Sequence, residues 1–231
     1  MIAQLVPPAV SSADSFEDHG WDALYPEERA LVRNAVESRR REFATARACA
    51  RAALSGLGLP PVPILPGVRN VPQWPTGVVG SLTHCAGYRA AAVAHSTAFH
   101  AIGIDAEPNE ALPDGVLGSI ATAEDLRHLD AAPRDGVVHW PRLLFSAKES
   151  VYKAWFPMTG IELDFADATV HAVADPRPTA APSAGEATGS FTARIRFQGQ
   201  TPDGHPVSGF SGRWLVRRGI IVTTATLPVP A

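Results

Sequence analysis

The stretch Pro141-Arg-Leu-Leu-Phe-Ser-Ala-Lys-Glu-Ser-Val-Tyr-Lys-Ala-Trp155 carries the clearest helical pattern in the chain. Its large apolar residues recur at spacings near 3.6, as in a helix that buries one face. These residues are Leu144, Phe145, Val151, Tyr152 and Trp155. Proline suits the first position of a helix and glycine favours its end. The pattern therefore predicts a helix from Pro141 to Gly160.

Strand patterns lie on both sides of this helix. Short apolar runs bounded by turn residues predict strands at 78–83, 89–94 and 99–105, then at 168–173, 190–197, 213–216 and 220–226. A Cys-Ala-Gly turn predicts a hairpin of the first two, and Arg-Arg-Gly a hairpin of the last two. The segment 175–189, rich in Ala and Pro, is predicted to be a mobile surface loop.

Two further helical patterns precede Pro141. One begins at Pro26 and runs, with a break allowed, to about Leu54, and Gly56 favours its end. A shorter one covers 123–129. Residues 1–25 are predicted to be irregular, and the proline-rich segment 59–67 to be extended.

This order, helix and strands followed by helix and strands, predicts an α+β fold with two halves of similar size. We place an N-terminal half at residues 1–104 and a C-terminal half at residues 105–231. No repeat of identical residues supports the division.

Composition excludes several classes of protein. Of the 231 residues, 45% are hydrophobic and 19% charged, which is enough to bury a core. The formal net charge of −3 argues against a general nucleic-acid binder. Cys49 and Cys85 cannot form a disulfide framework or a C-x-x-C zinc site. We see neither a signal peptide nor an apolar run of the roughly 20 residues that a membrane span needs. We therefore expect a cytoplasmic protein with reduced thiols that does not bind membranes.

Asp105 and Glu107 follow a buried strand at i and i+2, so their side chains share one face. Two carboxylates placed in this way can converge on Mg²⁺, which prefers oxygen ligands. The alternative is an ordinary polar strand end that enters the turn at Pro108-Asn109.

Lys148, Glu149 and Lys153 lie in the apolar helix after Pro141. The Glu149–Lys153 pair has the i, i+4 spacing of a surface ion pair, which is the simplest interpretation. Glu149 could instead complete a metal site and accept a proton from an incoming hydroxyl, and Lys153 could neutralise a departing phosphate.

Two polar segments precede these acids. Gly80-Ser81-Leu-Thr83-His84 offers hydrogen-bond donors to phosphate oxygens, or is a hairpin with a structural histidine. The cluster from Arg39 to Arg51 suits phosphates, or is a solvated basic face paired to Glu37 and Glu42.

Together these segments form a known set of motifs. The segments are Trp74-Pro-Thr-Gly-Val-Val-Gly-Ser-Leu-Thr-His-Cys85, Ile102-Gly-Ile-Asp-Ala-Glu107 and Phe145-Ser-Ala-Lys-Glu-Ser-Val-Tyr-Lys153. With the stretch Arg40–Arg51, this set resembles the 4′-phosphopantetheinyl transferases of the surfactin-synthetase type. The enterobactin-synthase-component-D-like branch of actinobacteria is the most similar. The resemblance runs from about Pro26 to Pro157, and less clearly into Gly212-Arg-Trp.

The resemblance implies an enzyme that transfers 4′-phosphopantetheine from coenzyme A to a serine of an acyl or peptidyl carrier protein and releases 3′,5′-ADP. It implies two α+β halves related by a pseudo-two-fold axis, with coenzyme A in the cleft between them. A monomer is natural for such a fused architecture. The implied metal is Mg²⁺, with Mn²⁺ as the alternative.

The resemblance also implies roles at individual positions. Asp105, Glu107 and Glu149 correspond to metal ligands. Glu149 corresponds to the base that accepts the serine proton, and Lys153 to the lysine that assists the leaving 3′,5′-ADP. The implied coenzyme A contacts are Arg39, Arg47, Ser81, Thr83, His84, Asp105, Lys148 and Lys153.

One departure from the family concerns Pro66, where close relatives tend to have lysine. We expect Arg69 to take over that phosphate contact; weaker binding of coenzyme A is the alternative. Two other functions stay open: a coenzyme A-binding accessory protein without transferase activity, and a metal-dependent phosphohydrolase. The sequence does not specify whether a fatty-acid, polyketide or nonribosomal-peptide carrier is served.

Overall fold

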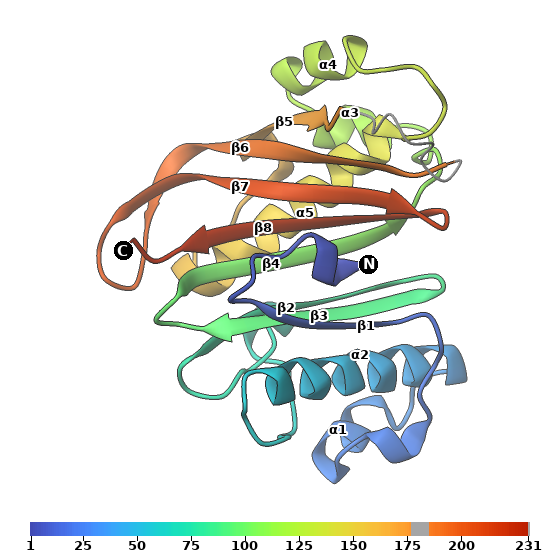
Figure 1. Cartoon of the computed structure of the whole chain (residues 1–231), viewed down its shortest axis with the longest axis vertical. Coiled ribbons are helices and arrows are strands. Elements are labelled where there is room, and N and C mark those ends of the chain that lie inside the picture. The colour runs from blue at the N-terminus through green and yellow to red at the C-terminus, as the bar shows by residue number, and fades with distance from the viewer. Residues whose placement is uncertain (177–184, 231) are drawn as a thin grey trace.

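A computed structural model describes residues 1–176 and 185–230. In this part of the chain the strands form two antiparallel sheets, of order β1-β3-β2 and β4-β8-β7-β6-β5. Figure 1 shows the two sheets along the long axis of the molecule, and β2 contacts β4 where they meet. The predicted α+β fold with two halves is confirmed.

The strands of the first sheet are β1 (Ser11–Ser15), β2 (Val78–Cys85) and β3 (Tyr88–His95). Those of the second sheet are β4 (Phe99–Pro108), β5 (Ala168–Ala174), β6 (Ala187–Gln200), β7 (Pro206–Arg217) and β8 (Ile220–Pro228). The helices are α1 (Pro26–Val32), α2 (Glu37–Gly56), α3 (Val116–Ile120), α4 (Ala123–Asp130) and α5 (Trp140–Thr159). Short 3₁₀ helices cover Ile2–Gln4, Trp21–Ala23, Val68–Asn70 and Phe165–Asp167.

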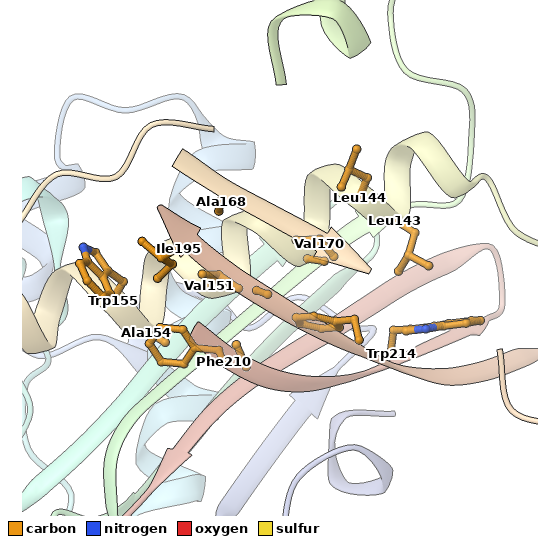
Figure 2. Close-up of a cluster of buried hydrophobic side chains, with 14 of the residues drawn as sticks. Leu143, Leu144, Val151, Ala154, Trp155, Ala168, Val170, Ile195, Phe210 and Trp214 are labelled. Carbon is orange, nitrogen blue, oxygen red and sulfur yellow. The ribbon is translucent and has the colours of Figure 1, made fainter. Parts of the chain in front are cut away.

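A long helix covers each sheet. The 20-residue helix α2 packs on β1 and β3, and the 20-residue helix α5 packs on β4 and β8 (Figure 1). Figure 2 shows part of the core beside α5, where Val151 and Trp155 lie near Ile195 and Phe210. Burying each such side chain contributes about 1.5–3 kcal/mol, so this packing fixes the rotation of α5 about its axis.

Gly103 allows α5 to approach β4 unusually closely. A Cβ atom at this position would lie 1.8 Å from the carbonyl oxygen of Ser150 and 2.6 Å from the amide nitrogen of Ala154. No side chain fits in that space, because real Cβ contacts are longer. Gly103 therefore brings the strand that carries Asp105 and Glu107 directly against the helix that carries Glu149 and Lys153.

Most predicted elements are present, with longer strands and a break between α1 and α2 at residues 33–36. Residues 1–25 include a strand that the prediction of irregular structure missed. The polar sequence of β1 has weak strand propensity, but its main chain pairs with β3 from Ser11↔Val93 to Ser15↔Arg89.

The predicted loop at 175–189 and the predicted boundary between the halves can each be compared with the structure. Residues 187–189 of the predicted 175–189 loop belong to β6, and residues 177–184 lie outside the described residues. The predicted boundary between residues 104 and 105 falls inside β4, and the division into halves at that point stays a prediction.

Candidate active site

A cavity of about 570 Å³ lies between α1, α2 and β2 on one side and α5 on the other. The segment 66–72 closes part of its wall. The predicted site residues that line it are Arg39, Arg47, Arg69, Ser81, His84, Glu149 and Lys153. Side chains from both halves of the sequence thus meet at one cavity.

Asp105 and Lys153 join β4 to α5 beside this cavity. Lys153 Nζ donates to Asp105 Oδ1 at 2.6 Å, and Thr83 Oγ1 donates to the same oxygen at 3.4 Å. Asp105 is buried, and its second oxygen, Oδ2, has no hydrogen-bond partner in the described part of the chain. An unpaired buried carboxylate oxygen is costly, so Oδ2 is poised to accept a ligand.

Glu107 and Glu149 lie within electrostatic reach of Asp105. Burial and the negative charge of Asp105 raise the pKa of Glu107, and Arg142 partly offsets them. Burial and Asp105 likewise raise the pKa of Glu149, against the opposing effect of Lys153. The negative charge of Asp105 therefore acts on both glutamates, and a cation placed near the three predicted metal ligands would be stabilised by all of them.

The acids are not arranged as a ready metal site. Among residues 1–176 and 185–230, no group of three or more His, Cys, Asp or Glu side chains could hold a metal ion as placed. Asp105 pairs instead with Lys153, and Glu107 pairs with Arg142 at 3.0 Å. The chemistry of the donor set still fits Mg²⁺, which prefers carboxylate oxygens, and Asp105 Oδ2 is an unsatisfied oxygen.

The polar side chains on the N-terminal wall of the cavity are cationic or neutral donors. Arg39 Nη1 lies 2.8 Å from His84 Nε2, and Glu42 contacts both side chains. Burial, with the charge of Arg39, lowers the pKa of His84. Arg47 stacks its guanidinium 3.5 Å from the ring centroid of Phe43, and burial lowers its pKa to about 10. This wall suits an anionic ligand.

Arg69 reaches the cavity from the same wall as Pro66. Its backbone has a φ of 54°, a left-handed conformation that is uncommon for residues other than glycine. Its side chain is exposed and pairs with Glu162 at 2.7 Å. Arg69 is thus placed where a phosphate contact is predicted, but Glu162 holds it in this structure.

Ser81 and Thr83 have different positions. Ser81 lines the cavity, and its Oγ accepts the amide proton of Ile104 at 3.1 Å, which ties β2 to β4. Thr83 is only 2% exposed and lies beside Asp105 rather than on the cavity wall. Thr83 can therefore orient Asp105, whereas Ser81 can contact a ligand.

Lys148 requires a correction. It does not line the main cavity, and its side chain is 1% exposed. Its ammonium group donates to Ile120 O, Asp125 Oδ2 and Phe165 O at 2.7, 2.7 and 2.8 Å. All three protons are used, so the predicted contact with coenzyme A is not supported by this arrangement. The physical reason is that Lys148 precedes Glu149 by one residue and thus leaves the helix in another direction.

Arg142 is a residue that the sequence reasoning missed. It lies seven residues before Glu149, so both side chains project from the same face of α5. The seven-residue spacing could have predicted that Arg142 lies on the same helix face as Glu149, and this face packs on the strand that carries Glu107.

The fold and the site define a class of protein: a two-half α+β architecture with acids and a lysine beside a basic cavity. Two family models match the chain, "4'-phosphopantetheinyl transferase N-terminal domain" at residues 27–94 and "4'-phosphopantetheinyl transferase superfamily" at residues 101–208. The chain belongs to the 4′-phosphopantetheinyl transferase superfamily, as the motifs predicted.

Three named proteins illustrate what this chain is similar to. The chain is 48% identical to 4′-phosphopantetheinyl transferase Svp of Streptomyces mobaraensis, over 100% of this chain and 91% of the relative. It is 43% identical to 4′-phosphopantetheinyl transferase PptT of Mycobacterium tuberculosis, over 98% of each chain. It is 33% identical to enterobactin synthase component D of Salmonella typhimurium, over 62% of this chain and 58% of the relative. None of the described helices is long and apolar enough to cross a membrane.

Proposed function

We propose that this protein transfers the 4′-phosphopantetheine group from coenzyme A to a serine of an acyl or peptidyl carrier protein. The observation that carries the proposal is the meeting of Asp105, Glu149 and Lys153 beside a cavity with a basic wall. Asp105 lies far from Glu149 and Lys153 in the sequence, so an i, i+4 surface pair within one helix does not explain why the three meet.

Asp105, Glu107 and Glu149 are the residues that would hold Mg²⁺, or Mn²⁺ in its place. The ion would supply positive charge to the pyrophosphate oxygens, which lowers the cost of attack by a nucleophile. The fit rests on hard oxygen donors and on the unpaired Oδ2 of Asp105.

The N-terminal wall would bind the phosphates of coenzyme A. Arg39, Arg47 and His84 line it together, and Arg69 is placed to join them on release from Glu162. Guanidinium groups bind phosphate through two parallel hydrogen bonds, so they orient the pyrophosphate as well as neutralise it.

Glu149 would accept the serine proton as the serine oxygen attacks the phosphorus that carries pantetheine. The bond from that phosphorus to the bridging oxygen breaks, and 3′,5′-ADP leaves. A raised pKa makes Glu149 a stronger base than an ordinary glutamate once it is ionised. Lys153 would leave Asp105 and neutralise the departing phosphate, so catalysis consists of positioning and electrostatics.

Several finer assignments are part of the same proposal. The match to enterobactin synthase component D supports the surfactin-synthetase type and its component-D-like branch. Action in the cytoplasm belongs to the same proposal, and the single chain with two halves supports a monomer.

Mass spectrometry of a carrier protein incubated with coenzyme A, Mg²⁺ and this protein tests the proposal. We expect a gain of one phosphopantetheine on the carrier and equimolar 3′,5′-ADP. Glu149→Gln should abolish most of the gain, and the exposed Asp114→Asn should not affect it.

Two outcomes would overturn the proposal. Release of 3′,5′-ADP without any carrier would identify a phosphohydrolase. Binding of coenzyme A without modification of any carrier in a panel of fatty-acid, polyketide and peptide carriers would identify an accessory protein.

A further inference from the structure

We infer that Arg142 is a positioning residue, which holds the carboxylate of Glu107 in the orientation needed to bind a divalent metal ion. The inference rests on the proposed function, because that function gives Glu107 its role. It adds a residue from outside the three sequence motifs.

The guanidinium of Arg142 is anchored at three points. Nη1 donates to Glu107 Oε2 at 3.0 Å, Nη2 donates to Ala111 O at 2.7 Å, and Nε donates to Glu110 O at 3.3 Å. The side chain is 12% exposed. A planar group held at two nitrogens by backbone carbonyls has little freedom, so it fixes the Glu107 oxygen that accepts from its third nitrogen.

Only one oxygen of Glu107 is used in this way. Oε2 accepts from Arg142, and no hydrogen bond joins Oε1 to any other residue of the described ranges. A carboxylate held by one oxygen presents the other in a defined direction. Metal-binding carboxylates are commonly held by such outer partners, and loss of the partner weakens metal binding about 10- to 100-fold.

Arg142 differs from Lys153, which also pairs with an acid of β4. Lys153 is 29% exposed, lines the cavity and pairs with Asp105. It can turn toward a ligand without breaking a network. Arg142 is bound to two backbone carbonyls besides Glu107, so it stays in place when a ligand arrives. Lys153 is thus a movable cation, and Arg142 a fixed support.

A purely structural role must be separated from this one, because Arg142 also ties the turn after β4 to α5. Asn109 ties the same turn independently: its Nδ2 donates to Val137 O at 2.8 Å, and its Oδ1 accepts the amide proton of His139 at 3.0 Å. Asn109→Ala therefore loosens the turn without touching Glu107, and it is the matched control.

The experiment measures Mn²⁺ binding by electron paramagnetic resonance of free Mn²⁺, with coenzyme A present and no carrier. We expect Arg142→Met to raise the Kd for Mn²⁺ about tenfold or more. Arg142→Lys should lie between wild type and Arg142→Met, because lysine keeps the charge but not the anchored fork. Asn109→Ala should bind Mn²⁺ as the wild type does.

Three results would overturn the inference: unchanged or tighter Mn²⁺ binding by Arg142→Met, the same loss in Asn109→Ala, or wild-type binding by Arg142→Lys. If Arg142→Met does not fold, Glu107→Gln defines the full loss, and Arg142→Lys must lie between it and the wild type. Carrier loading by the wild type is measured in a separate assay, which tests the proposed function. A wild type that binds Mn²⁺ but loads no carrier would refute the proposed function alone.

Discussion

Lys153 and Asp105 form an ion pair between α5 and β4, with Nζ and Oδ1 2.6 Å apart. Lys148, five residues earlier on the same helix, forms a different ion pair with Asp125 at 2.7 Å. The first pair borders the cavity, and the second is buried beneath α4. Two lysines of one motif thus have different surroundings, one beside the cavity and one inside the fold.

Substitution of each lysine by methionine should show the effect of these different surroundings. Lys148→Met leaves the buried carboxylate of Asp125 without its cation, and breaking such a pair costs about 3–5 kcal/mol. Lys153→Met also removes the cation of a buried carboxylate, that of Asp105, but Lys153 is itself 29% exposed, so it should lower the melting temperature less than Lys148→Met does and lower kcat for carrier loading at least about 100-fold. Thermal unfolding and loading kinetics on both variants check this. A stable, inactive Lys148→Met would contradict it.

Gly103→Ala should destabilise the protein and damage the site together. The new Cβ would meet the backbone of α5 at Ser150, so helix and strand must separate. Overpacking costs about 1–3 kcal/mol, and a contact with backbone lies at the upper end of that range or above it. Gly118→Ala is the control, because a Cβ there has no atom within 4 Å. Equal melting temperatures for the two variants would show that α5 does not depend on Gly103.

Arg69→Met should raise the KM for coenzyme A about tenfold and leave kcat nearly unchanged, since a charged hydrogen bond to phosphate is worth about 1.5–3 kcal/mol. Glu162→Gln should keep or tighten coenzyme A binding, because it releases Arg69 from its present partner. Loading kinetics measure KM and kcat for Arg69→Met, and calorimetry measures coenzyme A binding by both variants. Weaker binding in Glu162→Gln would mean that the pair, rather than free Arg69, supports the ligand.

His84 should make stability and coenzyme A binding depend on pH. Burial and Arg39 lower its pKa below the ordinary 6.5, so the unfolded chain takes up a proton at higher pH than the folded protein does. The free energy of unfolding should therefore fall as pH drops from 6.5 toward the folded pKa. His84→Gln should remove that part of the pH dependence. Melting temperatures of the wild type and of His84→Gln, measured at several pH values below 6.5, check this.

Coenzyme A should act on His84 in the opposite direction, because its phosphates should raise the pKa of that side chain. A phosphate beside His84 favours the charged imidazole, so binding should take up a proton near pH 6.5. Calorimetry in two buffers of different ionisation enthalpy measures the uptake, and His84→Gln should reduce it. Equal uptake by both proteins would place the phosphates away from His84.

Local sequence patterns determined much of this protein. The β2–β3 hairpin and α5 follow from apolar periodicity and turn residues, which act over a few neighbours. The placement of Asp105 and Glu107 on one strand face, and of Glu149 and Lys153 one helical turn apart, follows from regular backbone geometry. The motifs then indicated the family, which the matched relatives confirm.

Tertiary packing decided which charges meet. The buried face of α5 and the close approach at Gly103 set the rotation of the helix, and that rotation turns Lys153 toward Asp105 and Lys148 away from the cavity. The role of Arg142 and the pairing of β1 with β3 depend on the same long-range contacts. No local pattern specifies them, because the partners lie far apart along the chain and meet only when each half folds.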